Sequence, residues 1–143
     1  MAVSVLAPEK TRLEGGDLSY QVKMTNTGAT PAMQVAGMMT ATLSTKMPLD
    51  LRSITIDPTK PPWNQQSTAT LAKDGSSFYP VQLGARLTAE HIQAIEGKRQ
   101  YLVVFGQVDY VDVFNAKHRT EVCFVYLPTT FGMGHCPQHN NMD

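Results

Sequence analysis

Two apolar runs between Tyr101 and Tyr126 give the strongest structural signal in the chain. The first run places apolar side chains on both faces of an ideal strand, because successive residues alternate. Strands of this kind are usually central in a sheet or covered on both sides. The second run, residues 120–127, alternates in the same way, and the intervening residues 112–118 include Asn115, which tolerates left-handed backbone angles. The pattern predicts an antiparallel β-hairpin.

Earlier segments also have strand patterns. Residues 18–26 alternate apolar and polar side chains, which predicts a half-buried strand. Residues 32–43 include good helix formers, but Val35, Gly37 and several threonines favour a strand. Further short strands are predicted at residues 51–56, 66–71 and 77–83, with a turn at 73–76 between the last two.

One segment follows helical spacing instead. Leu87, Ile92 and Ile95 recur on one face of a helix. Thr88 suits the N-cap position and Gly97 suits the end of a helix. The sequence therefore predicts one short helix at 87–96, before the hairpin.

About seven or more short strands, with turn signals roughly every ten residues, indicate an immunoglobulin-like antiparallel β-sandwich. A barrel is the main alternative. We expect residues 1–16 to form a lead-in or edge strand, residues 17–130 the sandwich, and residues 131–143 a glycine-rich loop tied to it. The tryptophan between two distant cysteines that marks antibody domains is missing, so the similarity is one of architecture.

Composition limits the classes of function. The 143 residues suit one domain, and 12 basic residues balance 12 acidic ones, so no electrostatic footprint for nucleic acid or an anionic membrane is present. No apolar run approaches the roughly 18 residues of a membrane-spanning helix. The first residues also lack the charged and apolar regions of a signal peptide.

The two cysteines leave two interpretations open. An even cysteine count in a small β-rich chain is compatible with one disulfide, between Cys123 and Cys136, which would attach the tail to the last predicted strand. The alternative is two unrelated thiols in a reducing cytosol.

The same region offers zinc ligands. Cys123, His135, Cys136 and His139 could close a tetrahedral site, with His118 as a substitute. Structural zinc sites generally present two separated ligand pairs, however, and here Cys123 stands alone on its strand. A metal site is therefore the alternative prediction, and no cofactor is expected.

Catalytic signatures are missing from the sequence: it has no nucleophile elbow, zinc-protease motif or phosphate-binding loop. Cys123 with His118 or His139 would make a thiol–imidazole pair, but a cysteine on a regular strand is more often a core residue or a crosslink. Asp109 and Asp112 fall on opposite faces of a strand, and Asp112 is expected to accept backbone N–H bonds in the turn. We expect no enzymatic activity.

The hairpin, the tail and one early loop resemble a group of uncharacterised bacterial membrane-anchored proteins. The matching positions are Gly106, residues 110–114, His118, Thr120, Cys123, Phe124, residues 136–143, and residues 26–28 with 30–32. The chain departs from the pattern at Asn115, where glycine is usual, and at Val122, where an aromatic residue is usual. The resemblance implies an extracytoplasmic domain that follows one or two transmembrane helices, and it supports a Cys123–Cys136 disulfide. It implies no activity.

Together these observations predict a non-enzymatic, extracytoplasmic β-sandwich domain with a structural or protein-interaction role. Its expected partner is a protein at or near the membrane. The alternative is a zinc-binding module built from the C-terminal cysteines and histidines.

Overall fold

The computed structural model describes residues 3–6, 16, 19–45, 69–83, 86–136 and 141–142. In chain order its elements are β1 (Val3–Leu6), β2 (Ser19–Asn26), β3 (Ala32–Ser44), β4 (Ala69–Leu71), β5 (Ser76–Gln82), α1 (Ala89–Glu96), β6 (Tyr101–Val111), β7 (Lys117–Leu127), β8 (Gly132–His135) and β9 (Asn141–Met142). The strand predicted at residues 51–56 lies outside the described residues.

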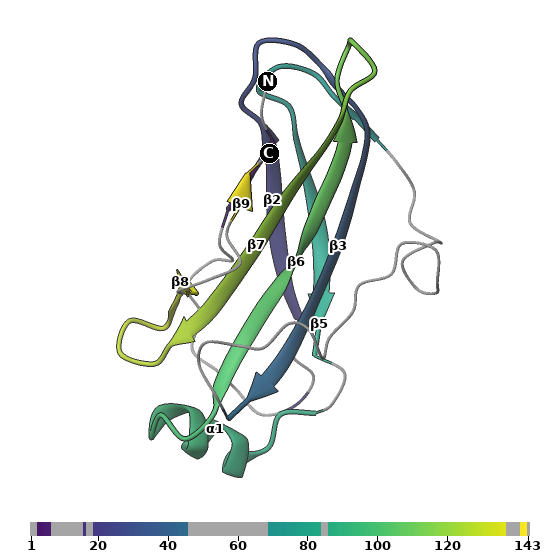
Figure 1. Ribbon diagram of the computed structural model, residues 1–143. Helices are drawn as coiled ribbons and strands as arrows, with labels where there is room; N and C mark the ends of the chain where they lie inside the picture. The colour runs from purple at the N-terminus through teal and green to yellow at the C-terminus, as the bar shows by residue number, and fades with distance from the viewer. Residues whose placement is uncertain are drawn as a thin grey trace.

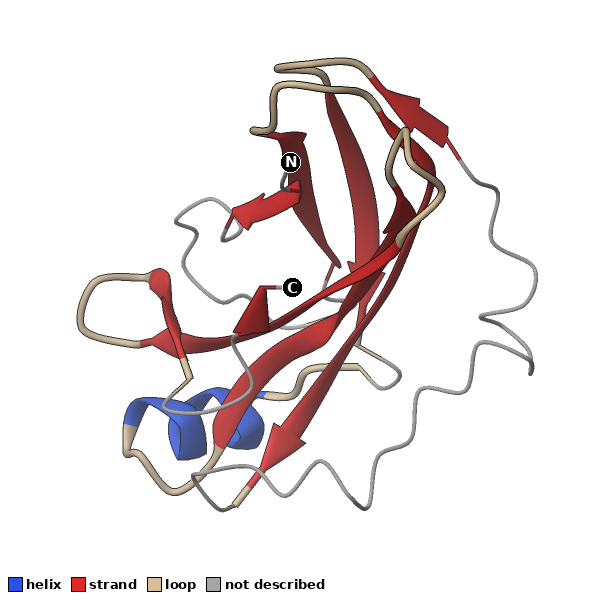
Figure 2. Ribbon diagram, turned by 45° about the horizontal axis from the view of Figure 1, so that its top comes forward, coloured by secondary structure: helices blue, strands red, loops and turns tan. Residues whose placement is uncertain are grey.

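The strands form two antiparallel sheets (Figure 1). One has the order β1-β2-β5, and the other has the order β4-β3-β6-β7-β8, with β9 also paired to β7. Figure 2 shows these strand layers with α1 at one end. The predicted all-β antiparallel sandwich with one short helix is confirmed for the described part of the chain, and the barrel alternative is not the observed architecture. No helix in this part is both long enough and apolar enough to cross a bilayer.

The core follows the alternation of the two hairpin strands. Even-numbered residues of β6 and β7 face the smaller sheet and pack against apolar residues of β2. This cluster includes Val22, Met24, Leu102, Val104, Val108, Tyr110, Val122 and Phe124. Odd-numbered residues of the hairpin form a second buried cluster on the other face, which includes Val103, Phe105 and Cys123. Strand β6 is therefore central in its sheet and buried on both faces, as its sequence predicts.

A contact between β3 and β5 joins the two sheets at one margin. The Gly37 amide donates to the Tyr79 hydroxyl oxygen at 2.8 Å. A side chain at position 37 would place its Cβ 2.8 Å from the Tyr79 ring, so glycine is needed for this approach. An isolated parallel bridge between Ala41 and Leu83 lies further along the same margin.

Helix α1 begins at the predicted cap. The Thr88 hydroxyl accepts from the His91 amide at 3.2 Å, and His91 Nδ1 accepts from the Thr88 amide at 3.1 Å, which forms a reciprocal capping box. Gly97 is the C-cap, but its φ of −82° is ordinary. The left-handed residue is Lys98, with φ 57°.

The prediction that the tail is a loop is wrong for residues 132–135 and 141–142, which form β8 and β9. Strand β8 pairs with β7 in antiparallel register, with Gly134 opposite Val125. Glycine has low strand propensity, but here the backbone of β7 supplies partners for the ladder. The missing Cβ also leaves room for Leu127, whose Cδ1 lies 3.0 Å from the position a Cβ would take on Gly134.

Candidate functional site

A disulfide fixes the tail to the sandwich. Cys123 lies on β7 and is fully buried, and Cys136 follows β8 directly. Their sulfurs are bonded at 2.04 Å, and the Cys136 amide donates to the Cys123 carbonyl at 3.0 Å. The predicted Cys123–Cys136 disulfide is confirmed.

The disulfide removes the two thiolates that the predicted zinc site would use. Zinc binds cysteine as a thiolate, and the sulfurs of Cys123 and Cys136 are bonded to each other. His135 packs its ring against Phe124, with centroids 5.2 Å apart, and His118 lies in a separate contact with Asp112. His139 is outside the described residues. Within those residues, no three histidine, cysteine, aspartate or glutamate side chains gather as a metal-binding group.

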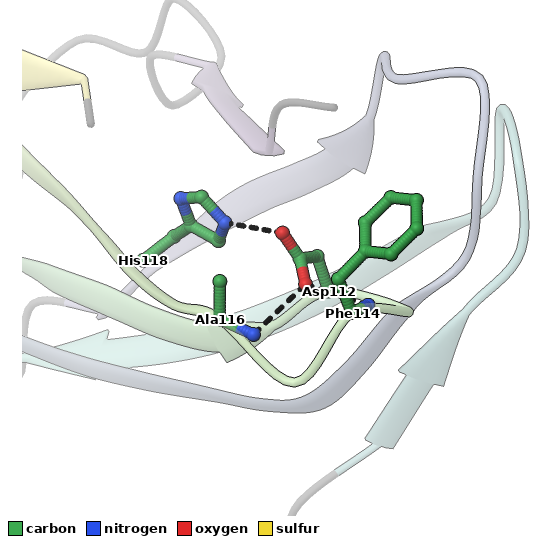
Figure 3. A network of polar contacts seen from close by, with 4 residues as sticks. All are labelled: Asp112, Phe114, Ala116 and His118. Carbon is green, nitrogen blue, oxygen red and sulfur yellow. Dashed lines mark hydrogen bonds and ion pairs between the residues drawn. The ribbon is translucent and has the colours of Figure 1, made fainter.

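The turn between β6 and β7 is organised by one carboxylate (Figure 3). Asp112 Oδ1 accepts from the amides of Phe114 at 2.8 Å and Ala116 at 2.9 Å. Asn115 takes the left-handed conformation with φ 65°. Both roles are as the sequence predicts. Asp112, the first residue of the turn, thus fixes the backbone of its tip, residues 113–116.

The other oxygen of the same carboxylate contacts β7. Asp112 Oδ2 lies 2.8 Å from His118 Nε2. The hydrogen bond from His118, followed by those from the backbone amides, lowers the pKa of Asp112 below its ordinary value. Because an ionised carboxylate can only accept, Nε2 carries the proton in this contact. The His118 ring also stacks on Tyr110, its neighbour across the hairpin, with centroids 5.0 Å apart.

Sequence reasoning missed the Asp112–His118 contact. It considered His118 only as a metal ligand or as a partner for a thiol. The contact depends on the turn length, which places Tyr110 opposite His118 and so brings His118 back to Asp112. The alternation of β6 and β7 would have indicated this pairing once the turn was centred on residues 113–116.

The tip of the turn presents apolar side chains to solvent. Phe114 is 87% exposed, and the neighbouring Val113 is 44% exposed. The Phe114 ring extends away from the Asp112–His118 contact (Figure 3). A large aromatic side chain is therefore displayed on a turn whose backbone is hydrogen-bonded in place.

A cleft of about 440 Å³ lies beside this turn. Strand β3 contributes Gln34, β6 contributes residues 109–111, and β7 contributes residues 117–119. Inside the cleft, Asp109 is held by Arg119 through contacts of 2.8 Å to Nε and 3.2 Å to Nη2, and Gln107 donates to it at 3.3 Å. The hydrogen bond with Asp109 raises the pKa of Arg119.

A buried asparagine supports two further loops at this end of the molecule. The Asn26 side chain donates to the carbonyls of Thr30 at 2.8 Å and Leu71 at 3.0 Å, and it accepts from the Gly28 amide at 3.0 Å. Asn26 ends the strand predicted at residues 18–26, and its side chain is fully buried.

The three connections β2–β3, β4–β5 and β6–β7 lie together at the end of the sandwich opposite to α1 (Figure 1). We define this as the loop end: the three connections and the cleft beside the β6–β7 turn. Backbone bonds between Asn26 and residues 74 and 75 tie the first two connections to each other. No protein-family model, curated protein or solved structure matches the chain.

Proposed function

We propose that this protein is a non-enzymatic, extracytoplasmic immunoglobulin-like domain that binds a protein partner through its loop end. The exposed Phe114 on its hydrogen-bonded turn is the observation that carries the proposal. Aromatic residues are enriched in protein interfaces and among the residues that contribute most to binding.

The strand order supports an immunoglobulin-like assignment. Constant-type immunoglobulin domains place strands A, B, E and D in one sheet and C, F and G in the other. If β1, β2 and β5 are A, B and E, then β3, β6 and β7 are C, F and G, and β4 takes the C′ position beside C. The comparison is one of topology, and fold alone does not define function.

This correspondence gives the loop end a role. The β2–β3 and β6–β7 connections take the places of the B–C and F–G loops, which form part of the binding surface in variable domains. Rigid aromatic side chains on such loops supply contact area at a low cost in conformational entropy. This correspondence supports a binding role for Phe114 and the adjoining cleft.

The cysteines support the extracytoplasmic location. Structural disulfides persist in oxidising compartments and are rare in the cytosol. The Cys123–Cys136 disulfide and the resemblance to membrane-anchored bacterial proteins point to the same side of the membrane.

Matched alanine substitutions of three exposed phenylalanines test the proposal. Phe114, Phe78 and Phe131 are 87%, 58% and 43% exposed, but only Phe114 belongs to the loop end. Full-length protein carrying each substitution is isolated under native conditions from its own host, and co-purifying proteins are quantified. The proposal expects one partner that is retained by wild type, Phe78→Ala and Phe131→Ala and lost with Phe114→Ala. Equal recovery in all four samples would reject it.

A further inference from the structure

A β-bulge beside the cleft gives one residue with a side chain, Gln34, an unfavourable backbone conformation. On β3, Met33 pairs with Val111 and Ala36 pairs with Asp109, so β3 has one more residue than β6 over this stretch. Within the bulge, Gln34 has φ 51°. Glycine adopts this region without steric cost, whereas a residue with a Cβ does not. Bulges often re-aim a side chain beside a functional site, and strain of this kind is a reason to look for one.

Gln34 lies across the cleft from a lysine. Val111 pairs with Met33 on one side and with Lys117 on the other. Gln34 and Lys117 therefore belong to strands on either side of β6, roughly 10 Å apart given the spacing between neighbouring strands. Both residues are exposed, and both line the cleft.

Some polar side chains that line the cleft have ion-pair or hydrogen-bond partners and others do not. Among the residues that the structure describes, the Lys117 ammonium has no ion pair and the Gln34 amide has no hydrogen bond. The carboxylate of Asp109 is already bonded to Arg119, which uses only two of its five N–H donors there. The cleft thus offers unused donors and one uncompensated positive charge.

The same cleft has an apolar part. Val111 lies between Gln34 and Lys117 and supplies an apolar side chain to the cleft lining. A volume of about 440 Å³ is within the range of roughly 300–1,000 Å³ that small-ligand sites occupy. A ligand with an anionic group next to a large apolar side chain matches both parts.

We propose that this cleft binds a carboxylate of the partner protein that lies next to an aromatic or large aliphatic residue. Lys117 and Gln34 donate to the carboxylate, Arg119 adds its remaining donors, and the neighbouring side chain packs on Val111. The carboxylate belongs either to the C-terminal residue or to an acidic side chain of the partner. This inference rests on the proposed function, because it names the chemistry that the loop end recognises.

Three small probes test the inference by NMR titration of the ¹⁵N-labelled full chain. N-acetyl-phenylalanine carries a C-terminal carboxylate, N-acetyl-aspartyl-phenylalanine amide carries a side-chain carboxylate, and N-acetyl-phenylalanine amide carries none. At least one acid should give saturable shifts at Gln34, Lys117 and Arg119, and its affinity should exceed that of the neutral amide by on the order of tenfold, as expected for a charged hydrogen bond. The acid that binds more tightly identifies the source of the carboxylate.

Variants separate recognition from folding. Lys117→Gln should weaken acid binding about tenfold, while Lys98→Gln, an exposed position just after α1 and away from the loop end, should leave it unchanged. Gln34→Gly removes the amide and also relieves the left-handed backbone, so it should weaken acid binding without lowering the melting temperature. A loss of stability in Gln34→Gly together with unchanged acid binding would show a purely structural role and contradict the inference.

Other outcomes would overturn the inference directly. They are equal affinity for acids and amide, shifts that do not saturate at the cleft residues, and binding of inorganic phosphate at least as tight as that of the acids. Failure here is distinguishable from failure of the proposed function. If Phe114→Ala abolishes partner binding while Lys117→Gln and Gln34→Gly do not, only the cleft assignment falls.

Discussion

Asp112 holds His118 at 2.8 Å with one carboxylate oxygen while its other oxygen accepts two amides of the β6–β7 turn. One side chain therefore couples the start of β7 to the backbone that presents Phe114. This makes the geometry of the tip depend on the charge of Asp112.

Acid should weaken this end of the molecule. The pKa of Asp112 is lowered in the folded state, chiefly by the hydrogen bond from His118, so its contribution to stability is present above the ordinary value of 3.8 and is lost as the pH falls through the lower folded value. Asp112→Asn keeps an oxygen acceptor for the turn but removes the charge. We expect this variant to have a lower melting temperature than wild type at neutral pH. Its melting temperature should also fall less steeply as the pH is lowered, as measured by thermal unfolding across pH. Asp74→Asn, in the β4–β5 turn, is the control, and an acid limb identical in wild type and Asp112→Asn would contradict the assignment.

Loss of the Asn26 amide should be costly. Asn26→Ala removes three hydrogen bonds, of which those with the Leu71 carbonyl and the Gly28 amide are buried and the one with the Thr30 carbonyl is partly buried. Each unsatisfied buried group costs about 1–3 kcal/mol, so we expect the free energy of unfolding to fall by about 3 kcal/mol or more in chemical denaturation. Ser76→Ala, which removes an exposed hydrogen bond to Thr25, should cost less than about 1 kcal/mol. Similar losses for the two variants would show that Asn26 does not anchor the loops.

Two glycines should respond differently to alanine. A Cβ on Gly106 would collide with the Met38 carbonyl oxygen and approach the Met39 Cα to 2.8 Å, and these backbone atoms cannot move away without disturbing the β3–β6 ladder. Overpacking of this kind costs typically 1–3 kcal/mol, and we expect Gly106→Ala to lie at or above the upper end of that range. At Gly134 the nearest atoms belong to the flexible Leu127 side chain, so Gly134→Ala should cost less. Equilibrium unfolding measures both, and the reverse order would contradict the predicted contacts.

Removing the disulfide should release the tail. The bonded cysteines are 13 residues apart, and closing a loop of about this length contributes roughly 3 kcal/mol in the chain-entropy model. The double variant Cys123→Ala, Cys136→Ala should lose stability of this order and exchange its β8 amide hydrogens faster, while β6 amides keep most of their relative protection. Hydrogen exchange measures the difference. Uniform loss of protection across β6, β7 and β8 would show that the bond supports the whole sheet instead.

The alternation of apolar residues was sufficient to predict much of this fold. It identified β2, β6, β7 and the two faces of the hairpin, while residue propensities favoured a strand for β3. Turn chemistry predicted the left-handed Asn115 and the hydrogen bonds that Asp112 accepts from backbone amides. These features depend on local periodicity and turn chemistry, which a sequence displays directly.

Features that depend on contacts between distant segments were not predicted. The glycine-rich tail forms β8 because β7 offers a free edge, and the left-handed Gln34 follows from the register between β3 and β6. The Asp112–His118 contact and the cleft likewise arise only once the strands are paired. One local feature was also not predicted: at the end of α1, Lys98 rather than Gly97 takes the left-handed angle.

Photocrosslinking at the tip tests the central claim most directly. A benzoylphenylalanine is placed at position 114, and in separate proteins at positions 78 and 131, and the crosslinked products are compared in living cells of the native host. Position 131 follows β7, whose 11 residues span roughly 35 Å, so it samples the other end of the strand. We predict that position 114 gives a discrete crosslinked product with one protein. The yield of this product should be much lower from positions 78 and 131. Adducts of equal yield from all three positions, or none from position 114, would contradict the assignment of the loop end as the binding surface.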